Sequence, residues 1–489
     1  MGNIKKNFIY NAAYQVLALL IPIITTPYLS RTLGVDAIGI FSYTYSIVSF
    51  FTIVAVSGTT IYGQRLIAFN RDDKEGLSRS FWEVFLFRLT ITVMVLAIYG
   101  IFVFNSVEYR FVYLTMSLNI INVVFDITWF YQGIEDFKKI VIRNMLVKIL
   151  NLISIFLFIK SEDDLIVYSL LYCGYIIIGN LSTWIGIKKK ITFVNAIHPF
   201  KNLKDIFLLF IPTVAMQVYT ILDKAMIGWF TSSTYENGCY EQAEKICRIA
   251  VTVVAALATV ISPRVANLYG KAKNGECQGN EIIDLLYKGI CYGCAIAVPI
   301  MMGIIAVTPV FVPVFFGEGY DKIQILLPIF SILVLAVGLA NIVGIAYLIP
   351  TEQQNIYTIA VTISAIVNFL MNIILIPLLL SVGAAIASVV AESIGIAIQM
   401  FCCITKNNMK IRYILAGVWK YFSASIVMLM AVILLRDIVQ NNWIGLFILI
   451  ILGVIIYSSM LIILKDELLI SNCRNIYVNY LLKNKRRSK

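Results

Sequence analysis

The sequence predicts an all-α integral membrane protein, and three observations support this fold class. Of its 489 residues, 60% are hydrophobic and only 13% are charged. A soluble chain of this size cannot hide so much apolar surface. The apolar residues gather in stretches long enough to cross a bilayer, which takes about 20 residues as a helix. The basic residues between these stretches also fit one membrane topology, as described below.

Fourteen stretches qualify as spans, which predicts about 14 transmembrane helices. The first follows Lys5 and Lys6, and it is too long and lacks the cleavage site of a signal peptide, so we expect an uncleaved helix. The predicted spans are 8–29, 37–61, 81–104, 111–131, 141–159, 165–187, 205–229, 243–263, 285–309, 323–348, 357–380, 384–405, 413–435 and 443–464.

The distribution of Lys and Arg predicts that both termini are cytoplasmic. With the N-terminus inside, 27 of the 39 basic residues fall in inner loops and tails, and five fall in outer loops. Such an excess of positive charge on the cytoplasmic side is typical of multi-pass proteins. We therefore attribute the net charge of +12 to the membrane topology and to contact of the basic tail with anionic membrane lipids. We do not interpret it as a sign of nucleic-acid binding.

Polar residues recur at helical spacing inside several spans. In the stretch 213–230, Thr213, Gln217, Thr220 and Lys224 lie at i, i+4, i+7 and i+11, which places them on one helix face. A charged side chain at the bilayer centre costs about 2.5 kcal/mol or more, so it faces a partner or water. Hydrogen bonds between neighbouring helices would account for the polar residues on some of these faces. A shared, water-filled and electropositive chamber explains the whole set better, and it would attract an anion such as phosphate.

The sequence lacks the motifs of several other functions. Gly270-Lys271 is followed by Ala272, so there is no nucleotide-binding P-loop, and no dinucleotide fingerprint occurs. The single histidine, His198, lies in a basic inner loop, which excludes a site built on paired histidines. The outer loops reach only about a dozen residues and no nucleophile stands beside a base. We therefore expect no catalytic site, no metal and no cofactor.

The chain also shows a weak internal repeat. The segments that begin the first and seventh spans each contain an Ile-Pro pair, at Pro22 and Pro212, and then a glycine, Gly39 and Gly238. A parallel repeat of six spans is a known transporter arrangement. We predict an N-terminal lobe over 1–195 and a C-terminal lobe over 196–405. Two further helices and the basic tail then occupy 406–489.

Six segments make the chain similar to Wzx-type polysaccharide flippases. These proteins belong to the multidrug/oligosaccharidyl-lipid/polysaccharide exporter superfamily, which also contains MurJ-like lipid flippases. The resemblance covers essentially the whole chain. The segments are PYLSRTLGVDAIGIFSYTYSI (27–47), FDITWFYQGIEDFKK (125–139), ILDKAMIGWF (221–230), GCYEQAEKI (238–246), SPRVANLYG (262–270) and FFGEGY (315–320).

The resemblance implies two six-helix lobes in a V around a cationic chamber, with two extra C-terminal helices that hold a lipid tail. It implies transport of an undecaprenyl-diphosphate-linked oligosaccharide to the outer leaflet of the bacterial plasma membrane, for surface polysaccharides such as O-antigen. A polysaccharide polymerase or glycosyltransferases would be partners. On this reading the candidate substrate contacts are Arg88, Lys148, Lys224, Arg248, Gln217, Asn119 and Asn122.

Other in-span residues have open roles. Asp126, Asp223 and Glu392 are candidates for binding a coupling H⁺ or Na⁺, or for acting as salt-bridge partners. Arg31, at the outer mouth, is a candidate gate or a loop cap. Two alternative functions remain: a cation-coupled multidrug antiporter of the same superfamily, and a membrane glycan polymerase. The extra helices disfavour the former, and the short outer loops disfavour the latter.

Overall fold

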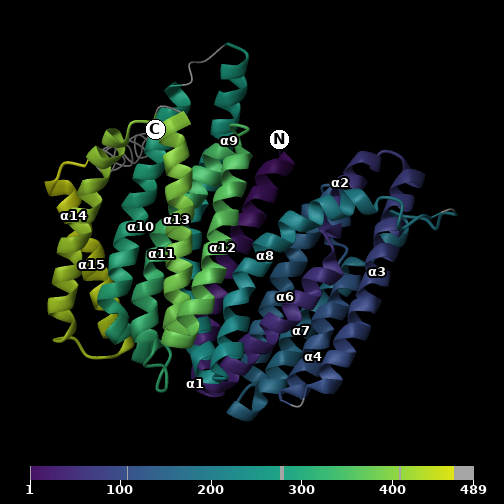
Figure 1. The fold of residues 1–489 in the computed structure, drawn as a ribbon, viewed down its shortest axis with the longest axis horizontal. Helices are drawn as coiled ribbons and strands as arrows, with labels where there is room; N and C mark the ends of the chain where they lie inside the picture. The colour runs from purple at the N-terminus through teal and green to yellow at the C-terminus, as the bar shows by residue number, and fades with distance from the viewer. Residues whose placement is uncertain (1, 107, 196, 276–279, 407–408, 467–489) are drawn as a thin grey trace, which may run out of the picture. The chain divides into compact units, whose positions relative to one another are not determined.

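The computed structural model describes residues 2–106, 108–195, 197–275, 280–406 and 409–466, with side chains except those of 2–14, 208–209, 211–220 and 411. Regular structure in these ranges is helical, without a β-strand, so the predicted all-α class is confirmed (Figure 1). The helices are α1 (Gly2–Val56), α2 (Thr59–Asn70), α3 (Lys74–Asn105), α4 (Arg110–Phe125), α5 (Thr128–Gly133), α6 (Phe137–Phe158), α7 (Leu165–Thr183), α8 (Leu203–Thr231), α9 (Thr234–Lys273), α10 (Asn280–Phe315), α11 (Ile323–Val343), α12 (Gln354–Leu379), α13 (Ser381–Lys406), α14 (Ile411–Arg436) and α15 (Trp443–Ile463).

Each of the fourteen predicted spans lies in helical segments of the structure, although not always in a helix of its own. In the described part of the chain, twelve segments are long and apolar enough to cross a membrane. One of them, Gln15–Asn70, contains the first two predicted spans, because α1 runs through both. The seventh predicted span is α8, whose side chains are described only in part. The predicted span 111–131 covers α4 and α5, which are separated by a break at Asp126 and Ile127. The multi-pass architecture predicted from hydropathy is therefore confirmed.

A single glycine separates the first two predicted spans. Gly34 has φ 75° and ψ 173°, a backbone conformation outside the helical region that glycine adopts readily. A Cβ at this position would also lie 3.2 Å from Oε1 of Glu162. The short outer loop that the sequence suggested here is therefore a sharp break inside α1.

The helices cluster into two units. Unit 1 comprises Met1–Glu241 and Met371–Ala384, and unit 2 comprises Gln242–Leu370 and Ala385–Lys489. In unit 1, α4 packs against α1, α3 and α7, and α6 packs against α1 and α7. In unit 2, α10 packs against α11, α14 and α15. The predicted lobes 1–195 and 196–405 follow the internal repeat and not these contacts, and they stay a prediction.

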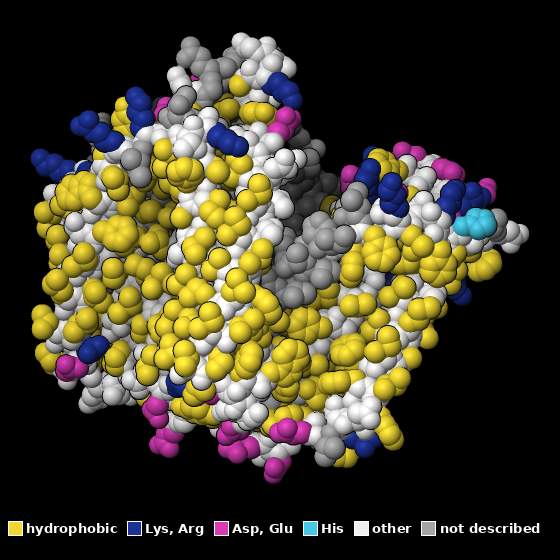
Figure 2. Space-filling model, viewed as in Figure 1, with side chains coloured by type: hydrophobic (Ala, Val, Ile, Leu, Met, Phe, Trp, Pro, Cys, Tyr) yellow, Lys and Arg dark blue, Asp and Glu magenta, His cyan; other side chains and the backbone are white. Residues whose placement is uncertain are grey.

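The surface of each unit fits a lipid environment. Large apolar side chains such as Phe104 of unit 1 and Leu434 of unit 2 are 74% exposed. Figure 2 shows hydrophobic side chains covering the middle of the visible face of α10–α15, with Lys and Arg mainly near the end where α14 begins. Side chains that would be costly in water are inexpensive against lipid tails, so this exposure is the expected surface of a membrane protein.

Two glycines allow the backbones of α1 and α9 to come into contact where these helices cross within unit 1. A Cβ on Gly39 would lie 1.9 Å from the carbonyl oxygen of Thr234, and a Cβ on Gly238 would lie 2.2 Å from that of Val35. Neither position has room for a side chain. Small residues at helix crossings allow such close approach in membranes. These are the two glycines that the internal repeat placed at equivalent positions, and the structure brings them into one contact.

We expect Gly39→Ala to lower the melting temperature of the purified protein in detergent by several degrees, because overpacking of this kind costs about 1–3 kcal/mol. Gly100→Ala is the matched control, since a Cβ on Gly100 in α3 would meet nothing within 4 Å. Equal melting temperatures for the two variants would contradict the close crossing.

Candidate functional site

Arg88 forms the most buried ionic cluster of unit 1. Its side chain is 1% exposed, and its guanidinium donates to the hydroxyls of Thr59 and Thr60, both at 2.8 Å, and to the carbonyl of Asp126 at 2.6 Å. The Asp126 carboxylate lies 3.9 Å away and also accepts hydrogen bonds from the amide and hydroxyl of Thr128. Arg88 thereby joins α2 and α3 to the break between α4 and α5. This enclosure favours a structural role over the predicted substrate contact.

A second cation, Arg143, lies among amide side chains from three helices. Its guanidinium donates to Oδ1 of Asn180 on α7 at 2.5 Å, and its Nε donates to Oδ1 of Asn144 at 2.9 Å. Asn180 in turn donates to Oδ1 of Asn122 on α4 at 2.7 Å. Arg143 was not among the candidate contacts, and it lies inside α6, half-buried. The predicted contact Asn122 therefore belongs to a polar cluster whose cation and third helix were missed.

The polar face of α6 continues beyond this cluster. Asn144, Lys148 and Asn151 follow at i, i+4 and i+7, and Lys148 is partly exposed. The side-chain oxygen of Asn151 is buried and has no hydrogen-bond partner among the described residues. Asn119 lies one turn before Asn122 on α4 and is 9% exposed. A cation and amides on facing helices can bind hydroxyl groups and a phosphate.

Lys224 is paired with a carboxylate that the sequence reading did not connect to it. Its Nζ lies 2.5 Å from Oε2 of Glu241, and the same oxygen accepts a hydrogen bond from Ser42 at 3.0 Å. The Lys224 and Glu241 side chains are 20% and 26% exposed. The pair links α8 and α9 to α1. Lys224 thus lies in a polar environment, as its helical position suggested, and an incoming anion would have to compete with Glu241.

Asp223, the acid next to Lys224 on α8, has partners of its own. It is 7% exposed, and it accepts hydrogen bonds from the hydroxyl of Tyr240 at 2.7 Å and from the amide of Asn372 at 2.6 Å. It therefore contacts α9 and α12, while its neighbour Lys224 contacts Glu241. The two adjacent charged residues of α8 therefore stabilise contacts with different side chains.

The remaining candidates are separate from these clusters. In unit 2, Arg248 is paired with Glu244 at 2.5 Å and stays 56% exposed, and Glu392 is partly exposed on α13. Arg31 is exposed on α1 before the break. The side chain of Gln217 lies outside the described residues. The convergence of candidates from both units on one chamber stays a prediction.

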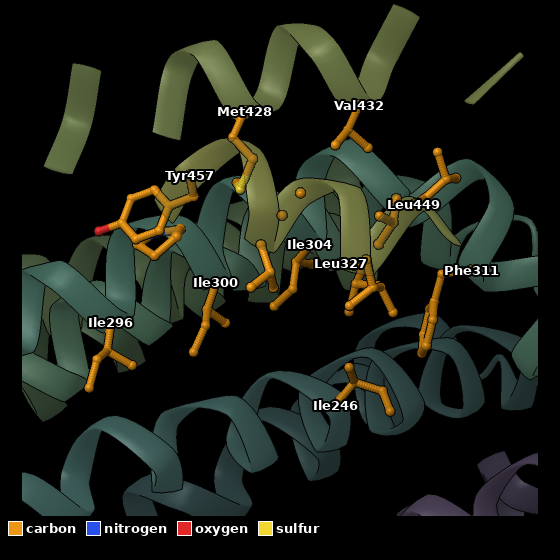
Figure 3. Close-up of a pocket in the computed structure, with 16 residues that line it drawn as sticks. Ile246, Ile296, Ile300, Ile304, Phe311, Leu327, Met428, Val432, Leu449 and Tyr457 are labelled. Carbon is orange, nitrogen blue, oxygen red and sulfur yellow. The ribbon is translucent and has the colours of Figure 1, made fainter. Parts of the chain in front are cut away.

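An apolar cavity of about 430 Å³ lies within unit 2. Figure 3 shows Met428 of α14 and Ile246 of α9 pointing toward the open space. Gly303 and Gly453 leave room on α10 and α15. The one hydroxyl among its lining side chains, that of Tyr457, donates to the carbonyl of Ala295 at 2.8 Å. The cavity is lined by Ile246, Ile296, Pro299, Ile300, Gly303, Ile304, Val307, Phe311, Leu327, Met428, Val432, Leu449, Ile450, Gly453, Val454 and Tyr457. Such a lining suits a hydrocarbon chain.

We expect Arg88→Ala to destabilise the protein strongly, because removing one partner of a buried pair costs about 3–5 kcal/mol. Thr60→Ala, which removes one hydrogen bond to the same guanidinium, should cost about 1 kcal/mol. Lys148→Ala should leave stability within about 1 kcal/mol, since its side chain is partly exposed. Thermal unfolding in detergent checks all three, and a wild-type melting temperature for Arg88→Ala would refute the structural role.

Comparison with solved structures places this fold among known membrane transporters. It is similar to "Lipid II flippase MurJ, inward closed conformation", with a TM-score of 0.73 and 16% identity, covering 94% of this chain and 99% of that one. It is also similar to a structure described as the "Inward-facing conformation of a multidrug resistance MATE family transporter of the MOP superfamily", with a TM-score of 0.54 and 15% identity. That match covers 98% of the transporter but 83% of this chain.

Comparison of sequences identifies the family. The chain is 22% identical over 425 residues to a protein named "Putative O-antigen transporter" from Escherichia coli (strain K12), covering 83% of this chain and 97% of that protein. Residues 4–269, more than half of the chain, match the family described as "Polysaccharide biosynthesis protein". The resemblance to Wzx-type and MurJ-like flippases is thereby confirmed. The chain belongs to the polysaccharide biosynthesis protein family of multi-pass membrane proteins.

Proposed function

We propose that this protein translocates an undecaprenyl-diphosphate-linked oligosaccharide from the inner to the outer leaflet of a bacterial plasma membrane, for surface polysaccharide synthesis. Both termini would be cytoplasmic. The observation that carries the proposal is the apolar cavity of about 430 Å³ inside a helical membrane unit, in a chain that also places cations within its spans. Such a molecule has a long hydrocarbon tail and a charged, hydroxyl-rich head, and the chain offers an environment for each.

The head group needs cations for its diphosphate and hydrogen-bonding groups for its sugars. Arg143 and Lys148 on α6, with Asn122 and Asn180 on the facing helices, supply both within unit 1. Charge-assisted hydrogen bonds to phosphate are about twice as strong as neutral ones. We place the diphosphate near Lys148 and Arg143, because amide side chains from the facing helices gather at Arg143 within unit 1, and we assign Lys224 and Arg248 to secondary contacts.

The tail needs a route that keeps it out of water. The unit 2 cavity is lined by α10, α14 and α15 and would bury part of a polyprenyl chain. Burial of each CH₂ contributes about 0.8 kcal/mol in water, and far less against lipid, so the cavity mainly positions the tail. The match of residues 4–269 to the polysaccharide biosynthesis family favours a lipid-linked substrate over those of a multidrug antiporter. The cavity gives no support to a glycan polymerase, so we propose no catalytic role.

Translocation would proceed by alternating access, with the head group exposed to one side of the membrane at a time. We propose that a coupling H⁺ or Na⁺, if the cycle uses one, binds at Glu392, which is partly exposed on α13. Asp126 and Asp223 accept hydrogen bonds that join helices or turns, so we assign them a structural role. Glycosyltransferases or a polymerase of the same polysaccharide would act before and after this step.

We expect Lys148→Ala to reduce export of surface polysaccharide at least about tenfold, since it removes a charged contact worth about 1.5–3 kcal/mol. The measurement is lipid-linked oligosaccharide retained on the cytoplasmic leaflet in a deletion strain carrying the variant. Lys160→Ala, at an exposed loop position, is the control. Normal surface glycan in the Lys148→Ala strain would refute the assignment.

The tail cavity has its own test. A Cβ on Gly303 would meet only Met428 Cε at 3.9 Å, so Gly303→Leu should fold and fill part of the cavity. We expect the variant to export poorly while its melting temperature stays at or above wild type. Gly270→Leu, on an exposed face of α9 with nothing within 4 Å of a Cβ, should export normally. Equal export by the two variants would exclude the cavity from the transport path.

A further inference from the structure

A polar pocket of about 170 Å³ lies within unit 1, apart from the clusters described above. It is formed where α1, the segment before α4, and the connection from α8 to α9 meet. Its volume equals about six water molecules at roughly 30 Å³ each, which is the scale of one small polar molecule. The lining residues are Tyr43, Glu108, Tyr109, Gly228, Trp229, Ser232, Ser233, Thr234 and Asn237.

The lining combines aromatic rings with hydroxyl, amide and carboxylate groups. Trp229 is 61% exposed, and its side chain is hydrogen-bonded to that of Tyr43. The ring of Tyr43 in turn occupies the space over Gly228, where a Cβ would lie 2.2 Å away. Trp229 is therefore held by Tyr43, while much of its surface stays free to contact a ligand.

Charge in the pocket excludes a phosphate as its ligand. Its lining contains the carboxylate of Glu108 and no Lys or Arg. The hydroxyl of the neighbouring Tyr109 is hydrogen-bonded to this carboxylate, and burial raises the pKa of Tyr109 well above its usual value. The pocket thus presents donors, acceptors and an apolar ring face to a neutral ligand rich in hydroxyl groups.

The backbone at the pocket adopts rare conformations. Tyr109 and Ser232 both lie in the left-handed region, with φ of 55° and 49°. Residues other than glycine reach this region at a cost of roughly 1–3 kcal/mol, and such strain gathers at functional sites. Two such residues from separate segments line one small pocket. The surrounding structure therefore stabilises these two backbone conformations enough to offset their cost in free energy.

One buried polar side chain of the lining has no partner. Asn237 is 1% exposed, and neither its amide nitrogen nor its oxygen has a hydrogen-bond partner among the described residues. Leaving a buried polar group unpaired costs about 1–3 kcal/mol. A hydroxyl-rich ligand or water would satisfy it.

We propose that this pocket binds one sugar ring of the oligosaccharide head group, stacked on Trp229 and hydrogen-bonded by Glu108, Asn237 and the adjacent hydroxyls. The assignment rests on the proposed transport function and adds a sugar subsite to it. An aromatic ring face with polar groups at its edge suits the alternating apolar and hydroxyl surfaces of a sugar. The subsite would contribute to selection of the sugar, separately from the cations that bind diphosphate.

The test is saturation-transfer NMR on the purified full-length protein in detergent. The probes are free glucose, galactose, mannose, rhamnose, N-acetylglucosamine and N-acetylgalactosamine. We expect at least one of them to receive saturation, and Trp229→Ala to weaken its apparent affinity by roughly tenfold. Trp229→Phe should retain most of the binding. Phe230→Ala is the matched control, because Phe230 is the next aromatic residue, is 48% exposed and does not line the pocket.

Two results would overturn the proposal. Either none of the six sugars receives saturation from the wild-type protein, or Trp229→Ala binds as tightly as wild type, which would mark Trp229 as an anchor in the lipid headgroups. The measurement requires no translocation. A negative result therefore removes this subsite and leaves the transport function to the export assay with Lys148→Ala.

Discussion

A charge inside a membrane must be matched by partners or by water, and this constraint orders the polar residues of the molecule. Arg88 meets it by complete enclosure, with two threonine hydroxyls, a carbonyl and the Asp126 carboxylate around one guanidinium. Lys224 lies beside the Glu241 carboxylate, and Arg143 donates hydrogen bonds to the amide oxygens of Asn144 and Asn180. Groups from α2 and from the break between α4 and α5 enclose the Arg88 guanidinium of α3, so its charge holds these helices together.

The same constraint separates the two chemical parts of the proposed substrate. The polar clusters of α4, α6 and α7 and the sugar pocket belong to unit 1, whereas the apolar cavity beside α14 and α15 belongs to unit 2. Close backbone contact at Gly39 and Gly238 fixes α1 against α9 within unit 1. Carboxylates on α8 and α9 extend this contact to neighbouring helices, since Asp223 binds Asn372 and Glu236 accepts hydrogen bonds from Ser381.

Hydropathy and charge predicted the helices well, because the bilayer imposes length and composition on every span. Lys148 and Asn122 were candidate contacts, and the structure places Asn122 in a hydrogen-bonded polar cluster. The hydrogen-bond and ion-pair partners of these residues were not predictable. The spacing of polar residues along one helix does not reveal which other helix packs against that face. Arg143 lies near the start of the predicted span 141–159, and nothing in the sequence indicated that Asn180 and Asn122 would lie near it. The pocket at Trp229 left no periodic signal, because it is assembled from helix ends and connections.

The central claim is that this chain moves the head group of a lipid-linked oligosaccharide across a bilayer. Its most direct test is reconstitution of the purified protein into vesicles that contain an undecaprenyl-diphosphate oligosaccharide with a fluorescent sugar. A membrane-impermeant quencher or glycosidase then reports how much head group lies in the outer leaflet. The account predicts that protein-containing vesicles expose the remaining inner-leaflet head groups with time, while protein-free vesicles do not. The same exposure in both preparations would contradict it.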